Sequence, residues 1–125
     1  MSGKTVDSRK CQRVFFNAKD NIEGAVTAAG IEGPMIPVTF LNLGEGGVCF
    51  QAERNLCQKI APEQVFTLKK TGPGLLAFLD NINIQVKYCL DYDIVATITF
   101  GCEFKELPKN VLVEINKIIA AKLKT

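Results

Sequence analysis

The chain has 125 residues, 47% of them hydrophobic, so it is close to the modal size of one domain and can bury one core. Its formal net charge of +2 excludes the dense basic surface that holds long nucleic acid through many phosphates. The lack of histidine excludes Ser-His-Asp and Cys-His catalysis and removes the commonest metal ligand. The acidic residues are scattered singly, so we expect a non-enzymatic domain with no metal site and no cofactor.

The five cysteines are odd in number and show no CxxC spacing, which is typical of reduced, mostly buried thiols in a cytosolic protein. The first ten residues are polar and charged, and no segment approaches the ~20 apolar residues that a membrane span requires. We therefore expect a cytoplasmic protein without membrane insertion.

Residues 1–12 carry no periodic apolar pattern, and we interpret them as an N-terminal arm that is mobile when nothing is bound. The single domain is expected to span residues 13–125, with packing that begins at Val14–Phe16. Weak alternation over Ile22–Ala29 predicts a first strand, and Ile36–Leu41 and Val48–Phe50 predict two more.

The stretch Asn42–Gly47, Asn-Leu-Gly-Glu-Gly-Gly, is predicted to be the turn between these last two strands. Three glycines in four positions permit unusual backbone angles and let a ligand or another segment approach closely. Asn42, where the entering strand ends, offers both an acceptor and donors. The pattern alone is more typical of a plain hairpin loop whose glycines serve only the turn.

Further along the chain, Arg54–Pro62 is irregular, Arg54 is assigned to solvent, and Gln64–Lys70 is predicted to be a short strand. An unbroken period of two over Ile82–Leu90, with Tyr88 on the inward parity, is repeated over Ile94–Phe104. These two segments are expected to pair as an antiparallel hairpin.

After Pro108 the period changes to that of an amphipathic helix, with one apolar stripe. The stripe consists of Val111, Leu112, Ile115, Ile118, Ile119 and Leu123. About six strands followed by one helix predict a mostly β fold, an antiparallel six-stranded β-barrel with a C-terminal α-helix.

Two of the three arginines, Arg9 and Arg13, lie four residues apart where the arm meets the first packed residues. Alone this pair is typical of solvated side chains. Here it occurs in order with the Asn42-x-Gly44-x-x-Gly47 turn and with Gly101-Cys102-Glu103-Phe104 just before the terminal helix. This ordered set resembles the PilZ domain, a bacterial receptor for cyclic di-GMP, over nearly the whole chain.

The resemblance implies that Arg9 and Arg13 match the family motif RxxxR, and that Asn42 and Gly47 match (D/N)xSxxG. Gly44 stands where the motif has serine, so one ligand hydrogen bond is lost, worth about 0.5–1.5 kcal/mol. The implied ligand-binding residues are Arg9, Arg13, Asn42, Gly44 and Gly47. The implied function is cyclic di-GMP binding that orders the arm and signals to a downstream protein partner.

Two other functions remain open from the sequence. A PilZ-like adaptor that has lost nucleotide binding and contacts a protein partner is favoured by Gly44. A small barrel that binds single-stranded RNA needs exposed aromatic side chains between basic residues, and these are not evident in the pattern. Most of the eight phenylalanines fall on core parities.

Overall fold

The computed structural model describes residues 13–16, 20, 22–28, 35–57, 60–69, 76–92 and 94–123. The predicted arm, with Arg9, lies outside the described residues, so the boundary at residue 12 stays a prediction. Within the described residues the strands are β2 (Arg13–Phe15), β3 (Glu23–Ala28), β4 (Ile36–Gly44), β5 (Gly47–Glu53), β6 (Val65–Lys69), β7 (Asn83–Leu90) and β8 (Thr97–Lys105). Two short 3-10 turns, η1 (Arg54–Leu56) and η2 (Ala77–Leu79), and the helix α2 (Lys109–Leu123) complete them.

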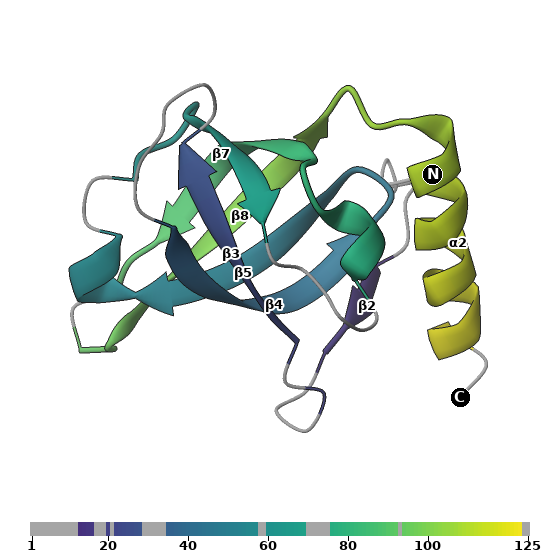
Figure 1. The fold of residues 1–125 in the computed structure, drawn as a ribbon. Helices are drawn as coiled ribbons and strands as arrows, with labels where there is room; N and C mark the ends of the chain where they lie inside the picture. The colour runs from purple at the N-terminus through teal and green to yellow at the C-terminus, as the bar shows by residue number, and fades with distance from the viewer. Residues whose placement is uncertain are drawn as a thin grey trace, which may run out of the picture.

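The strands form an antiparallel barrel, which confirms the fold class predicted from the alternation (Figure 1). Strands β4, β3, β6, β7, β8 and β5 pair in that order, and the pairing of β5 with β4 closes the ring. Strand β2 pairs with Asn42–Gly44 and β3 with Ile36–Thr39, both on the edge of β4 that faces away from β5. The N-terminal segment therefore continues the barrel wall along the end of β4.

The core is built on large apolar side chains that point into the barrel. Phe40, Phe50 and Phe100 are cross-strand neighbours on β4, β5 and β8, and all three are fully or almost fully buried. Their ring centroids lie 6.3 Å and 5.6 Å apart, in the range of favourable aromatic pairs. This row helps to fix the register of three strands, because a one-residue shift of any of them would turn its own ring toward solvent.

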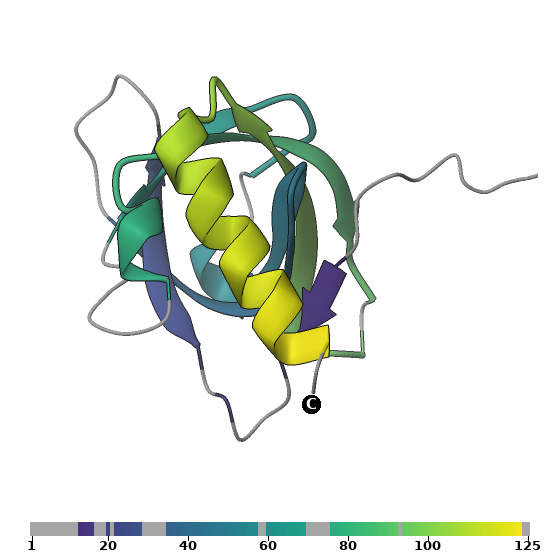
Figure 2. The same cartoon turned by 90° about the vertical axis from the view of Figure 1, so that its right-hand side faces the viewer.

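Helix α2 lies across one end of the barrel, as Figure 2 shows. Four of the six predicted stripe residues are confirmed: Val111, Ile115 and Ile119 are buried in the core, and Ile118 packs against it. Leu112 is half-buried, and the side chain of Leu123 lies outside the described residues. The helix contacts β2, β4 and η2. It thereby closes the apolar interior at the end where β2 begins.

The prediction that side chains alternate without a break along β7 is wrong beyond Val86. The pairing of β7 with β8 shifts between Val86 and Tyr88, which is the signature of a β-bulge at Lys87. The extra residue turns Tyr88 outward, where it is 48% exposed, and brings Cys89 against the core. Bulges re-aim a side chain in this way because the residue alternation restarts after the insertion.

The loop between β7 and β8 corrects two further predictions. Ile94 was expected in a strand but is 96% exposed, and β8 begins only at Thr97. Arg54 is not free in solvent: it forms an ion pair with Asp91 and donates hydrogen bonds to the carbonyl oxygens of Tyr92 and Val95, both at 2.6 Å. Arg54 thus holds the β7–β8 loop against η1.

Candidate binding site on the outer face of the barrel

Arg13 and Asn42 are in direct contact. Arg13 belongs to the predicted RxxxR motif and Asn42 to the predicted glycine turn. Strand β2 pairs with the end of β4, so that Arg13 lies opposite Gly44 and Phe15 opposite Asn42. The Nη1 atom of Arg13 donates a hydrogen bond of 2.8 Å to Oδ1 of Asn42. Asn42 is 9% exposed and is the only buried polar side chain among the described residues. A buried amide needs partners, and Arg13 supplies one of them.

Two small residues, Cys49 and Gly101, lie beside Asn42 on the next two strands of the sheet. Asn42 pairs with Cys49 on β5, and Cys49 pairs with Gly101 on β8. The neighbouring row, one residue out of phase, is the core row Leu43, Val48, Cys102 and Val86. Because side chains alternate between the two faces of a sheet, Asn42, Cys49 and Gly101 belong to the outer face.

Tyr88 covers the far side of this outer row. It pairs with Gly101, and a Cβ atom at Gly101 would lie only 2.1 Å from Cε2 and Cζ of the Tyr88 ring. The ring therefore occupies the space that a side chain at position 101 would need. Its hydroxyl group hydrogen-bonds the Cys49 thiol, which also hydrogen-bonds the side chain of Asn42. One connected network thus runs from Arg13 through Asn42 and Cys49 to Tyr88.

The glycines of the turn have different surroundings. Gly44 is the buried last residue of β4, and Glu45 and Gly46 form the turn itself. A Cβ atom at Gly47 would lie 2.0 Å from the carbonyl oxygen of Cys102, whereas one at Gly46 would meet nothing within 4 Å. Gly47 is thus needed for the close approach of β5 to β8, a reason that the sequence pattern alone does not distinguish from contact with a ligand.

Burial dominates the electrostatics of the thiol in the network. It raises the pKa of Cys49, although the hydrogen bond from Tyr88, the positive charge of Arg13 and the hydrogen bond from Asn42 each lower it. Cys49 therefore stays a neutral thiol at physiological pH, so the guanidinium of Arg13 is not neutralised by a thiolate. The positive charge of Arg13 is therefore available to an anion that approaches this face, with no thiolate beside it.

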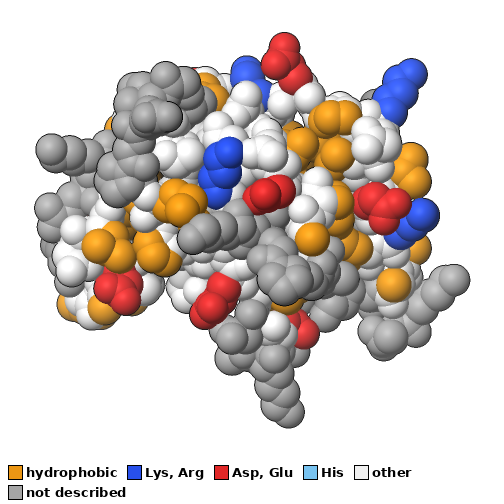
Figure 3. All heavy atoms as spheres, in the orientation of Figure 1, with side chains coloured by type: hydrophobic (Ala, Val, Ile, Leu, Met, Phe, Trp, Pro, Cys, Tyr) orange, Lys and Arg blue, Asp and Glu red, His pale blue; other side chains and the backbone are white. Residues whose placement is uncertain are grey.

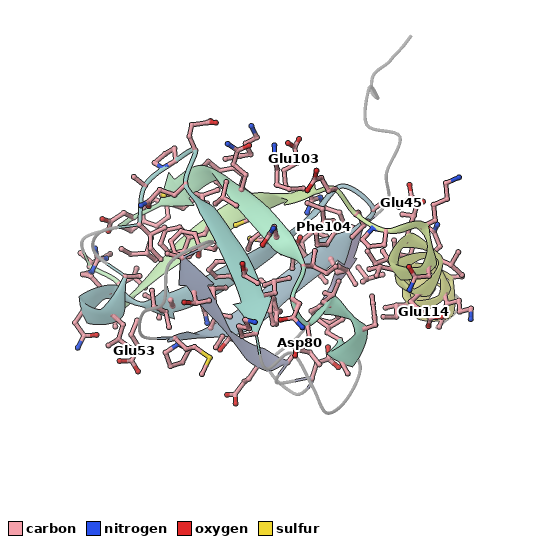
Figure 4. The ribbon with its side chains drawn as sticks, turned by 45° about the horizontal axis from the view of Figure 1, so that its top comes forward. Glu45, Glu53, Asp80, Glu103, Phe104 and Glu114 are labelled. Atoms are coloured by element: carbon pink, nitrogen blue, oxygen red, sulfur yellow. The ribbon has the colours of Figure 1, made fainter. Side chains whose placement is uncertain are left out.

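Two acidic residues, Glu45 and Glu103, lie near the turn. Figure 4 shows Glu45 and Glu103 in the same region of the barrel, with Glu53 at the other end of β5. Glu103 lies 3.9 Å from Nζ of Lys87, the bulge residue, so its charge is partly balanced. On the face seen in Figure 3, the described basic side chains stand singly among acidic ones, as the low net charge predicts.

The structure brings Arg13, Asn42, Gly44 and Gly47 together on adjoining ends of β2, β4 and β5, while Arg9 lies outside the described residues. Cys49, Gly101 and Tyr88 were missed as parts of this surface. The sequence placed Tyr88 inward because an inserted residue leaves no mark in an alternating pattern. Among the described residues, no group of three or more acidic or cysteine side chains could hold a metal ion.

Comparison with known proteins agrees with this architecture. No protein-family model and no curated protein sequence matches the chain. Among solved structures, the chain is similar to the PilZ domain of YcgR from Escherichia coli with c-di-GMP, with a TM-score of 0.72, 12% identity and coverage of 93% of this chain and 92% of that one. It is also similar to MrkH of K. pneumonia in complex with c-di-GMP, with a TM-score of 0.65 and 16% identity over 96% of this chain. The chain spans 57% of the length of MrkH.

At these identities the likeness establishes the fold: this chain has the fold of a PilZ domain. In the part of the chain that the structure describes, no helix is long and apolar enough to cross a membrane.

Proposed function

We propose that this chain is a cytoplasmic, non-enzymatic receptor domain for cyclic di-GMP. The observation that carries the proposal is the 2.8 Å hydrogen bond between Arg13 and Asn42, which joins the two motif halves on one outer face of the barrel. The two similar solved structures described above are both of complexes with c-di-GMP. Because many functions share one fold, the fold alone does not support this function. The proposal also depends on the motif residues Arg13 and Asn42, which are in contact on this fold.

The chemistry of Arg13 suits this ligand. Its guanidinium carries five N–H donors, and among the described residues one of them is used, in the contact with Asn42. The others can bind phosphate oxygens or O6 and N7 of guanine. Asn42 holds the guanidinium in place, which reduces the side-chain entropy lost on binding. Arg9, four residues earlier, supplies a second guanidinium to a ligand that carries two phosphates and two guanines.

The output of the receptor follows from where the motif lies. Arg13 begins the first described strand, and Arg9 belongs to the segment before it. A ligand held by both arginines would order residues 1–12 against the barrel and change the surface that a downstream protein partner meets. The alternative is a PilZ-like adaptor that binds a protein partner without nucleotide, favoured by Gly44 in place of serine.

Isothermal titration with cyclic di-GMP tests the proposal. We expect saturable binding, and we expect Arg9→Ala and Arg13→Ala each to weaken it by more than about 1.5 kcal/mol, the scale of a lost hydrogen bond to a charged group. Arg13→Lys should restore only part of the affinity, because an ammonium lacks the planar fork. Lys117→Ala is the matched control, since it removes one exposed cation of α2 whose described partner is Glu114 of the same helix.

Two results would contradict the receptor. Parental affinity in Arg13→Ala removes that arginine from the site, and absence of heat at high ligand concentration favours the adaptor. Gly44→Ser separates the two functions further. In a receptor the restored hydroxyl tightens binding by up to roughly 1 kcal/mol at unchanged melting temperature, whereas an adaptor shows no binding with either residue.

A further inference from the structure

Tyr88 is an aromatic side chain held in place at the edge of the candidate site. The ring lies over Gly101, where no side chain competes for the space, and its hydroxyl group is tied to Cys49. Tyr88 nevertheless remains 48% exposed. The ring is thus covered by the sheet on one side and open to solvent on the other. The ring is therefore held by its contacts although half of its surface is exposed.

The position of Tyr88 relative to Arg13 follows from the strand register. The outer row runs from Phe15 through Asn42, Cys49 and Gly101 to Tyr88. The Tyr88 ring leans back from its own strand over β8 and reaches Cys49 on β5. Only the row position of Asn42 then separates the Tyr88 hydroxyl from the strand that carries Arg13. A planar group bound by Arg13 at this face would adjoin the ring.

Resting on the proposed function, we infer that Tyr88 is a pre-organised stacking platform for one purine base of the ligand. A base stacked on the open side of the ring would gain aromatic contact without the entropy cost of ordering the tyrosine. The bulge at Lys87 is then part of the binding device, because it is what turns Tyr88 outward. Gly101 serves the same device by leaving room for the ring.

Tyrosine fluorescence tests this directly, because the chain contains two tyrosines and no tryptophan. In Tyr92→Phe the emission comes from Tyr88 alone, and in Tyr88→Phe it comes from Tyr92 alone. Tyr92 lies in the β7–β8 loop with an exposed side chain, away from the network of Arg13. We expect saturating cyclic di-GMP to quench Tyr92→Phe strongly, whereas Tyr88→Phe should show only the loss caused by absorption of the nucleotide.

Affinity gives the second readout. Tyr88→Ala should weaken binding of cyclic di-GMP by roughly 5- to 100-fold, the range for removal of one base–aromatic stack, at unchanged circular dichroism. Tyr88→Phe keeps the ring and should stay within a few-fold of the parent. Recovery by phenylalanine distinguishes stacking from a role of the hydroxyl in holding Cys49.

Three outcomes overturn the inference. Binding by the parent with no quenching of Tyr92→Phe places the ligand elsewhere, and parental affinity in Tyr88→Ala does the same. Tighter binding in Tyr88→Ala would mean that the ring covers the site and must leave it. In these cases the titration of the parent still shows binding, so the proposed function stands. Absence of binding by the parent refutes both.

Discussion

Gly47→Ala isolates what the last glycine of the turn contributes. The new Cβ atom would lie 2.0 Å from the carbonyl oxygen of Cys102 and 3.2 Å from Cα of Glu103. Both neighbours are backbone atoms of β8, so neither can rotate away. Since a normal contact is about 3.3 Å or more, the two strands must separate by about 1 Å at this point. The hydrogen bond from the amide of Phe104 to the carbonyl oxygen of Gly46, 2.9 Å long, would be stretched or lost.

The loss of unfolding free energy has two parts. Overpacking costs about 1–3 kcal/mol, and the loss of one or two backbone hydrogen bonds costs about 1 kcal/mol each. We therefore expect Gly47→Ala to lose about 2–5 kcal/mol of unfolding free energy, which lowers the melting temperature by roughly 10–20 °C. Gly46→Ala is the matched control, one residue away, with nothing near its Cβ atom, and should change stability by no more than about 0.5 kcal/mol.

Urea unfolding of the two variants, followed by circular dichroism, measures the difference. If Gly47→Ala and Gly46→Ala unfolded at the same urea concentration, the close approach of β5 to β8 could not be the reason for Gly47. The glycine would then have to be explained by contact with a ligand, and Gly47→Ala would lose affinity at full stability.

Two further predictions concern Arg54 and Cys102. Arg54→Ala removes the ion pair with Asp91 and the bonds to two loop carbonyl groups, so we expect a loss of about 1 kcal/mol, kept small by solvent screening, and faster cleavage by chymotrypsin after Tyr92. Burial raises the pKa of the Cys102 thiol from 9.0 to about 12, so the folded state holds this proton more tightly than the unfolded state. Its contribution is therefore complete below pH 9 and is lost as the pH rises toward 12. Cys102→Ala should flatten the alkaline loss of unfolding free energy by about 2 kcal/mol between pH 8 and pH 10.5.

The parts of the fold that sequence patterns predicted are those with regular periods. Val111, Ile115 and Ile119 repeat at helical spacing, and they are buried as expected. Strand β2 was recognised only as the start of packing, because its three residues are too few for any period to show. Its place beside the end of β4 depends on pairing across 29 positions of the chain, which no local pattern contains.

The candidate site also has residues that the sequence predicted and residues that it did not. The motif pattern singled out Arg13 and Asn42, and the structure shows them in contact. Tyr88 was placed inward because alternation was extended through Lys87, and Arg54 was left in solvent because its partner Asp91 lies 37 residues away. Both errors have one physical cause: a bulge and a long-range ion pair are decided by tertiary packing and leave no periodic trace.

Because of the bulge at Lys87, the residues of β7 that pack in the barrel interior and the residue that faces outward at Tyr88 lie in two different parts of the strand. Before it, Ile84 and Val86 face the barrel interior on even positions, and after it Cys89 approaches the interior on an odd one. Substitutions at Tyr88 can therefore change what the outer face recognises while the packing of Ile84 and Val86 stays untouched. If Lys87 were instead paired in a regular ladder, Tyr88 would face the interior and Cys89 the outside. The register of β7 with β8 therefore decides whether Tyr88 or Cys89 faces outward, while Ile84 and Val86 keep the same places in the interior.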